Sequence, residues 1–124
     1  MTAVAIGQLY EDGRLDLDAP IQTYVPAFPQ KAGTITTRLL AGHLAGIRHY
    51  GNNAEFVSAV PYDSVSEALA IFADDPLLFP PGSEFGYSTY GYNLISAVVE
   101  GAAGENFLDY MSQNVFGPAG MDST

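Results

Sequence analysis

The chain has 124 residues, and its 14 acidic and 4 basic side chains give a formal net charge of −10 at pH 7. This excess of negative charge argues against nucleic-acid and anionic-membrane partners, because both are themselves negatively charged. The absence of cysteine excludes a disulfide framework, a thiolate zinc site and a thiol nucleophile. The two histidines, His43 and His49, are too few for a histidine-rich metal centre, so neither a metal nor a cofactor is expected.

Length and hydropathy favour a single domain. With 48% hydrophobic residues, the chain is long enough to bury one compact core over residues 1–124. No apolar run approaches the roughly 20 residues that span a bilayer, and residues 1–12 lack the basic start of a signal peptide. A soluble chain without a targeting signal is therefore expected, and its compartment stays open.

The first predicted helix covers residues 2–12 and ends at Gly13. One apolar stripe marks it, made by Ala5, Ile6, Leu9 and Tyr10. The stripe starts without a capping side chain in front of it, so the helix looks like one that is entered midway. An irregular connection follows over residues 14–29, where three prolines prevent a long helix.

A second helix is predicted to start at Thr36 or Thr37 and to continue to Ile47. Its apolar face would hold Leu39, Leu40, His43, Leu44 and Ile47. Within that face His43 could act as a catalytic base or be a core histidine bonded to a backbone group, and the second interpretation is favoured. His49, in a polar loop, is expected to be exposed.

Three further helices are predicted after a loop over residues 51–63. The first opens with a capping box of Ser64 and Glu67. The second starts near Ser88 and the third ends before residues 117–118. Their apolar stripes are Val65, Ala68, Leu69 and Phe72; Leu94, Ile95, Val98, Val99 and Ala102; and Phe107, Leu108, Met111, Val115 and Phe116. About five helices and almost no convincing strand indicate a mainly α fold class.

Residues 84–93 are the most site-like stretch of the chain. The hydroxyls of Tyr87, Ser88 and Thr89 would cluster at the N-terminus of a helix, where the helix dipole favours anions and developing negative charge. A simpler interpretation makes Ser88 a helix cap and lets the tyrosines pack against the core. The residues alone favour this simpler interpretation.

Four stretches of sequence, in this order, carry a resemblance that covers nearly the whole chain. They are LYEDGRLDLDAP (9–20), ITTRLLAGHLAGI (35–47), FPPGSEFGYSTYGY (79–92) and FGPAGMDST (116–124). Together they resemble the penicillin-binding-protein-type serine hydrolases, the group of class C β-lactamases, their carboxylesterase relatives and the mitochondrial serine β-lactamase-like proteins. Each stretch alone is a weak signal, whereas the ordered set is specific.

The resemblance implies a fold in which a helical lobe packs on an antiparallel sheet. The predicted helices would form that lobe, with the sheet largely absent, as a single partial domain over residues 1–124. The family nucleophile belongs to a Ser-x-x-Lys motif, and a Lys-Thr-Gly-type motif shapes the pocket. Neither is found here, because the only lysine is Lys31 and the residue three positions before it is Phe28.

The resemblance also assigns the candidate site residues. Tyr87 matches the tyrosine of the family's Tyr-x-Asn motif, a hydroxyl that relays the proton of the nucleophile. Thr89 stands where class C enzymes carry asparagine, so one hydrogen-bonding hydroxyl replaces an amide. Thr89 and its neighbour Tyr90 are expected to contact the substrate, a small ester or amide. The departure at Thr89 weakens the case for penicillin or cephalosporin turnover and is compatible with an esterase or a peptidase-like relative.

Three functional hypotheses follow from these observations. The first is a fragment or truncated form of a serine hydrolase that is inactive alone. The second is a small self-sufficient esterase with Ser88 as nucleophile and His43 or His49 as base, although residues 86–90 lack the second glycine of a Gly-x-Ser-x-Gly elbow. The third is a helical interaction module. The first hypothesis is preferred.

A homo-oligomer is expected as well. In the resembled fold the first and last helices pack against the sheet, so part of their apolar faces would be left without a cover. Ile6, Leu9, Leu108 and Met111 are the side chains concerned. An uncovered patch of this kind usually marks an interface.

Overall fold

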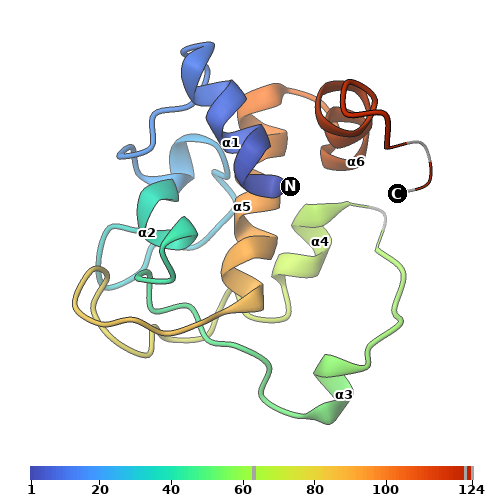
Figure 1. The fold of residues 1–124 in the computed structure, drawn as a ribbon. Coiled ribbons are helices and arrows are strands. Elements are labelled where there is room, and N and C mark those ends of the chain that lie inside the picture. Colours follow the sequence, from blue (N-terminus) through green and yellow to red (C-terminus); the bar gives the residue numbers. More distant parts are fainter. Residues whose placement is uncertain (63, 122, 124) are drawn as a thin grey trace.

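A computed structural model describes residues 1–62, 64–121 and 123. Asp63 in the predicted loop, and Asp122 and Thr124 in the last of the four sequence stretches, lie outside the described residues. The longest helix, α5 (Thr89–Ala103), runs through the middle of the molecule. The shorter helices α1 (Thr2–Glu11), α2 (Thr37–Ala41), α4 (Val65–Leu69) and α6 (Phe107–Met111) pack around it (Figure 1).

The predicted apolar stripe explains the central place of α5. Leu94, Ile95, Val98 and Val99 are completely buried, and α5 has neighbours on several sides. Three small elements complete the chain: the 3₁₀ turn η1 (Ile21–Thr23), the one-turn helix α3 (Asn53–Phe56) and the π-helical turn η2 (Ser112–Phe116). Within the described ranges the structure has no strand, apart from an isolated antiparallel bridge between Pro20 and Thr36. The predicted mainly α class is confirmed.

Side-chain caps start four of the helices, three of them at or next to the predicted positions. A side-chain oxygen at each N-cap accepts a backbone N–H of the first turn, which satisfies a group that has no partner inside the helix. The pairs are Thr36 with Leu39, Ser64 with Glu67, Ser88 with Gly91 and Asn106 with Leu108. In addition, Asn52 caps α3 inside the stretch that the sequence analysis assigned to a loop. Local sequence thus determines where these helices begin.

The predicted helix over residues 36–47 is wrong in its second half. Helix α2 ends at Ala41, and His43 has a left-handed backbone with φ of 57°. The N–H groups of His43 and Leu44 still bond to α2, but the carbonyls of residues 43, 44 and 46 accept N–H groups of the distant segment 78–86 instead of continuing the helix. His49 is also half-buried rather than exposed.

The faces of the first and last helices are largely covered, contrary to the expectation from sequence. Ile6, Leu9 and Met111 are buried, because α1, α6 and η2 pack against one another as well as against α5. Gln8 fastens this contact: its Nε2 donates to the Asn114 carbonyl at 2.8 Å. Of the four side chains that were expected to be uncovered, Leu108 is the one that is exposed, with 70% of its surface accessible. The predicted homo-oligomer therefore loses most of its original basis.

The described helices include none that is both long and apolar enough to cross a membrane.

Gly101 allows α5 to approach the backbone of the η1 turn. A Cβ atom at this position would lie 1.9 Å from the Tyr24 carbonyl oxygen, far inside van der Waals contact. By contrast, a Cβ atom at Gly7, in the interior of α1, would meet no atom within 4 Å. The two helical glycines therefore differ in the space available to a side chain.

We predict opposite effects for alanine at these two glycines. Gly101→Ala should lower the free energy of unfolding by about 1–3 kcal/mol or more, because α5 and η1 must separate. Gly7→Ala should raise it by about 0.5–1 kcal/mol, because alanine has the higher helix propensity. Urea unfolding followed by far-ultraviolet circular dichroism measures both. Equal stability of the two variants would contradict this packing.

Candidate active site

The segment that leads into α5 is held by backbone hydrogen bonds to residues 43–46. The bonds are Leu78 N to Gly46 O, Gly82 N to Leu44 O and Gly86 N to His43 O, at 2.8, 2.8 and 2.9 Å. Gly46 permits this approach, since its φ is 76° and a Cβ atom there would lie 2.4 Å from the Phe79 carbonyl oxygen. The backbone on the N-terminal side of Tyr87 therefore has a defined position.

Ser88 is the N-cap of α5 and is buried, with 3% of its surface exposed. Its hydroxyl accepts the Gly91 N–H at 2.9 Å and donates to the Arg48 carbonyl at 2.7 Å. The hydroxyl proton is thus hydrogen-bonded to a backbone oxygen. If the Ser88 side chain rotated to attack a substrate, α5 would lose its N-cap. This geometry favours the capping role of Ser88 over the role of a nucleophile.

Both histidines bind the start of α5. His43 Nδ1 accepts the Ser88 N–H at 3.3 Å, and His49 Nδ1 accepts the Thr89 N–H at 3.2 Å. The expected bond of His43 to a backbone group is present, but the residue is half-buried rather than part of the core. Since a backbone N–H can only donate, each Nδ1 must be unprotonated, and each neutral ring carries its proton on Nε2.

Tyr87 projects from the surface beside these two imidazoles, with 62% of its area exposed. Its ring centre lies 4.7 Å from that of His43 and 5.5 Å from that of His49. No hydrogen bond joins the Tyr87 hydroxyl to another residue in the part of the chain that the structure describes. An exposed phenol is therefore presented at the positive end of α5.

Thr89 and Tyr90, the predicted substrate contacts, lie in different environments. Thr89 is half-buried at the first position of α5, two residues after Tyr87. Tyr90 is buried, with 2% exposed, and stacks on Phe72 with ring centres 4.7 Å apart. The position of Tyr90 favours a supporting role behind the site rather than contact with a substrate.

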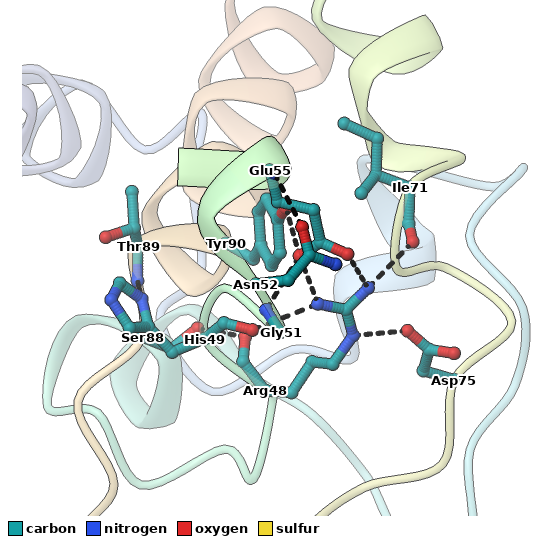
Figure 2. Close-up of polar contacts among 10 residues, drawn as sticks. All are labelled: Arg48, His49, Gly51, Asn52, Glu55, Ile71, Asp75, Ser88, Thr89 and Tyr90. Atoms are coloured by element: carbon teal, nitrogen blue, oxygen red, sulfur yellow. Dashed lines mark hydrogen bonds and ion pairs between the residues drawn. The ribbon is translucent and has the colours of Figure 1, made fainter. Parts of the chain in front are cut away.

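The support behind the site is a polar network around Arg48, shown in Figure 2. Arg48 Nη1 lies 2.8 Å from Glu55 Oε2, and its Nε forms an ion pair with Asp75. Arg48 also donates to two backbone carbonyls, those of His49 and Ile71, each at 3.0 Å. Tyr90 joins the network, because its hydroxyl donates to Glu55 Oε2 at 2.9 Å. The network links α5 to the segments on both sides of α3.

These contacts change the proton affinities of the network. The hydrogen bonds from Arg48, the Gly51 N–H and Tyr90 lower the pKa of Glu55 from 4.5 to about 2. Burial and the hydrogen bond to the Glu55 carboxylate raise the pKa of Tyr90 to about 12. Hydrogen bonds to both carboxylates raise the pKa of Arg48 above its usual value. At neutral pH Glu55 is ionised, and Tyr90 is a neutral donor to it.

Sequence reasoning missed Arg48, Glu55 and Asp75. Glu55 and Asp75 lie 7 and 27 residues after Arg48, and the chain from 48 to 52 is not helical, so no regular periodicity brings these side chains together. The one available signal was the scarcity of basic residues, 4 in the whole chain, which makes each a candidate for a specific carboxylate. The described residues include no cluster of three or more His, Asp or Glu side chains that could hold a metal ion.

The comparisons with known proteins identify a family that covers the whole chain. The family model described as Beta-lactamase matches residues 1–124. The chain is 33% identical over 184 residues to the human "Serine beta-lactamase-like protein LACTB, mitochondrial", a match that covers 94% of this chain and 34% of that protein. The chain therefore spans about a third of the length of the curated relatives it matches.

Solved structures share the fold of the chain. A penicillin-binding protein from Bacillus halodurans superposes with a TM-score of 0.79 and 35% identity, over 98% of this chain and 39% of that one. EstCE1, described as a hydrolase with promiscuous acyltransferase activity, superposes with a TM-score of 0.81 and 28% identity. That match covers 96% of this chain and 35% of EstCE1. The helical arrangement is thus one that recurs as a part of larger proteins.

We predict that Glu55 makes the free energy of unfolding depend on pH in the acidic range. Because its pKa is lowered from 4.5 to about 2 in the folded chain, ionised Glu55 stabilises the fold above pH 4.5. This contribution is lost as the pH falls towards about 2. Glu55→Gln should therefore reduce the slope of unfolding free energy against pH in this window, as measured by urea unfolding at a series of pH values.

Glu84→Gln is the matched control, since Glu84 is exposed and has the same side chain. It should leave the slope close to that of the unsubstituted chain. An unchanged slope in Glu55→Gln would show that the Arg48 network does not hold Glu55 in its ionised form.

Proposed function

Because the chain belongs to the Beta-lactamase family, we propose that it forms the tyrosine-bearing, helical side of an active site that hydrolyses small esters or amides through an acyl-enzyme. The observation that carries the proposal is the place of Tyr87. This residue matches the family's Tyr-x-Asn tyrosine, and it is exposed at the N-terminus of α5 while the backbone around it is held by hydrogen bonds. A fixed backbone with a free hydroxyl suits a group that must meet a reacting atom.

The proposed role of Tyr87 is to pass the proton of the nucleophile towards the leaving group. A phenol is a poor base at neutral pH, so it needs a nearby cation. Lys31, the only lysine, cannot supply that cation, because its Nζ donates to the Ala73 carbonyl and, at 2.7 Å, to the Asp75 carbonyl. A Ser-x-x-Lys pair outside this sequence would supply nucleophile and cation, and the 124-residue chain is proposed to be inactive alone.

The proposed substrates are small esters or amides rather than penicillins. Thr89 replaces the amide of the family's asparagine with a single hydroxyl, so a substrate amide would lose one of its two partners. EstCE1, a structural relative that is a hydrolase with promiscuous acyltransferase activity, supports this class. The alternative esterase with Ser88 as nucleophile finds no support, because that hydroxyl is buried and bonded on both sides.

Self-association remains a proposal with a different basis from the one expected from sequence. Large apolar side chains are exposed in the stretch after α3 and at isolated positions elsewhere, namely Phe56, Val57, Val60, Leu78, Phe85 and Leu108. Light scattering coupled to size exclusion should show more than one 13.2 kDa chain per particle at physiological ionic strength. A single chain per particle at low and high salt would end this proposal.

We predict that Tyr87, and not Ser88, decides activity once a nucleophile is present. The chain alone should not turn over a chromogenic short-chain ester or a chromogenic cephalosporin. A chimera in which residues 1–124 replace the matching segment of the Bacillus halodurans protein would restore the remainder of the fold. In that chimera Tyr87→Phe should lower kcat at least about 100-fold, the usual contribution of a proton-transferring group.

Two controls accompany the chimera. Tyr10→Phe alters an equally exposed tyrosine on α1 and should leave the rate unchanged. Ser88→Ala should lower the melting temperature through the lost cap, while kcat of the folded protein stays within about tenfold of the parent. Hydrolysis by the chain alone that disappears in Ser88→Ala would instead establish the small esterase.

A further inference from the structure

We infer that His43 and His49 are positioning residues for Tyr87, two imidazoles that bind the backbone beside it with Nδ1 and contact its ring, an inference that rests on the proposed role of Tyr87. Neither histidine is given a chemical step. Their effect on the reaction would pass through the orientation of the phenol.

The backbone on both sides of Tyr87 is bonded to these histidines. The Gly86 N–H donates to the His43 carbonyl at 2.9 Å, and the Ser88 N–H donates to His43 Nδ1 at 3.3 Å. His43 therefore binds the residue before Tyr87 and the residue after it. The Thr89 N–H, one position further, donates to His49 Nδ1 at 3.2 Å. Three of the four backbone N–H groups from residue 86 to residue 89 are bound in this way.

The Tyr87 ring is in contact with both imidazoles. Its plane makes an angle of 43° with the His43 ring and 69° with the His49 ring, at ring-centre distances of 4.7 and 5.5 Å. Rotation of the tyrosine about its side-chain bonds would break one or both contacts. The imidazoles thus limit the directions available to a side chain that is otherwise mostly exposed.

Each imidazole is itself braced by other groups. Phe85 and Tyr92 pack on His43, with ring centres 5.9 and 5.2 Å away. Tyr50 packs on His49 at 4.4 Å, and the His49 carbonyl accepts from Arg48 Nη1 at 3.0 Å. The Arg48 network therefore reaches Tyr87 through His49. Because its own orientation is restricted by these neighbours, each imidazole can restrict the orientation of the Tyr87 side chain.

The hydrogen bonds specify the tautomer of both rings. An Nδ1 atom that accepts a backbone N–H has no proton, so the proton of the neutral ring is on Nε2. A proton on Nδ1 would place two donors against each other, and if Nε2 were protonated as well the ring would also add positive charge at the positive end of α5. The Nε2–H tautomer is therefore a spectroscopic signature of the proposed arrangement, independent of any activity.

Nuclear magnetic resonance on the ¹⁵N-labelled 124-residue chain tests the arrangement first. At neutral pH, long-range ¹H–¹⁵N spectra should show unprotonated Nδ1 and protonated Nε2 in both histidines. The opposite tautomer, or the averaged signals of a free ring, at either histidine would overturn the inference for that residue.

Paired substitutions at His49 separate positioning from simple burial. In His49→Asn the amide oxygen takes the place of Nδ1, whereas in His49→Gln the amide lies at the place of Nε2. Hydrogen exchange of the Thr89 amide should be about tenfold faster in the glutamine variant, the change expected for one lost hydrogen bond, and nearly unchanged in the asparagine variant. His43→Asn is the second variant, because asparagine tolerates the left-handed backbone of His43.

The chimera supplies the functional readout. His49→Gln should lower kcat about 10-fold to 100-fold with little change in KM, as for a misplaced reacting group, and His49→Asn should recover most of the loss. If Tyr87→Phe abolishes turnover while both His49 variants keep the parent kcat, the positioning role is wrong and the proposed function stands. If the tautomers and the amide exchange behave as expected while Tyr87→Phe has no effect, the histidines hold the segment but the proposed function fails.

Discussion

The start of α5 is the point on which the candidate site depends. The first backbone N–H groups of a helix have no partner within the helix. Here side chains at or before the start of α5 provide hydrogen-bond acceptors for them. Ser88 accepts one, and His43 and His49 accept two more in the turn that carries Tyr87. Because two of these acceptors come from residues 43–49, the helix start and that segment cannot move independently. These hydrogen bonds therefore determine where Tyr87 lies.

The 4 basic side chains of the chain connect segments that are distant in sequence. Arg48 joins Glu55, Asp75 and two carbonyl oxygens, and Arg38 forms a bidentate pair with Asp18. Arg14 donates to the Ala103 carbonyl, and Lys31 donates to the carbonyls of Ala73 and Asp75. All 4 basic side chains of this acidic chain are therefore engaged in the described structure. None of them is free to be the cation that the proposed role of Tyr87 requires.

The comparisons place this arrangement within a larger architecture. The matched segment makes up between about a quarter and two fifths of the similar solved chains, and it superposes on them with TM-scores of 0.78 to 0.81. Burial of Ile6, Leu9 and Met111 shows that the helices close much of their apolar surface on one another. Exposed side chains such as Phe85 and Tyr87 are instead gathered where α5 begins. The polar site and the apolar core are thus at different places along the same helix.

The sequence by itself determined the features that depend on near neighbours. The apolar stripe of α5, the caps at Ser64 and Ser88 and the Tyr-Ser-Thr start of α5 follow from residues within one or two turns. Only the tertiary structure decided where α2 ends, because residues 43–46 bond to segment 78–86. It also decided the roles of His43 and His49, whose partners lie 45 and 40 residues away. Contacts over such separations leave no periodic trace in a sequence, so they are settled by packing rather than by local preference.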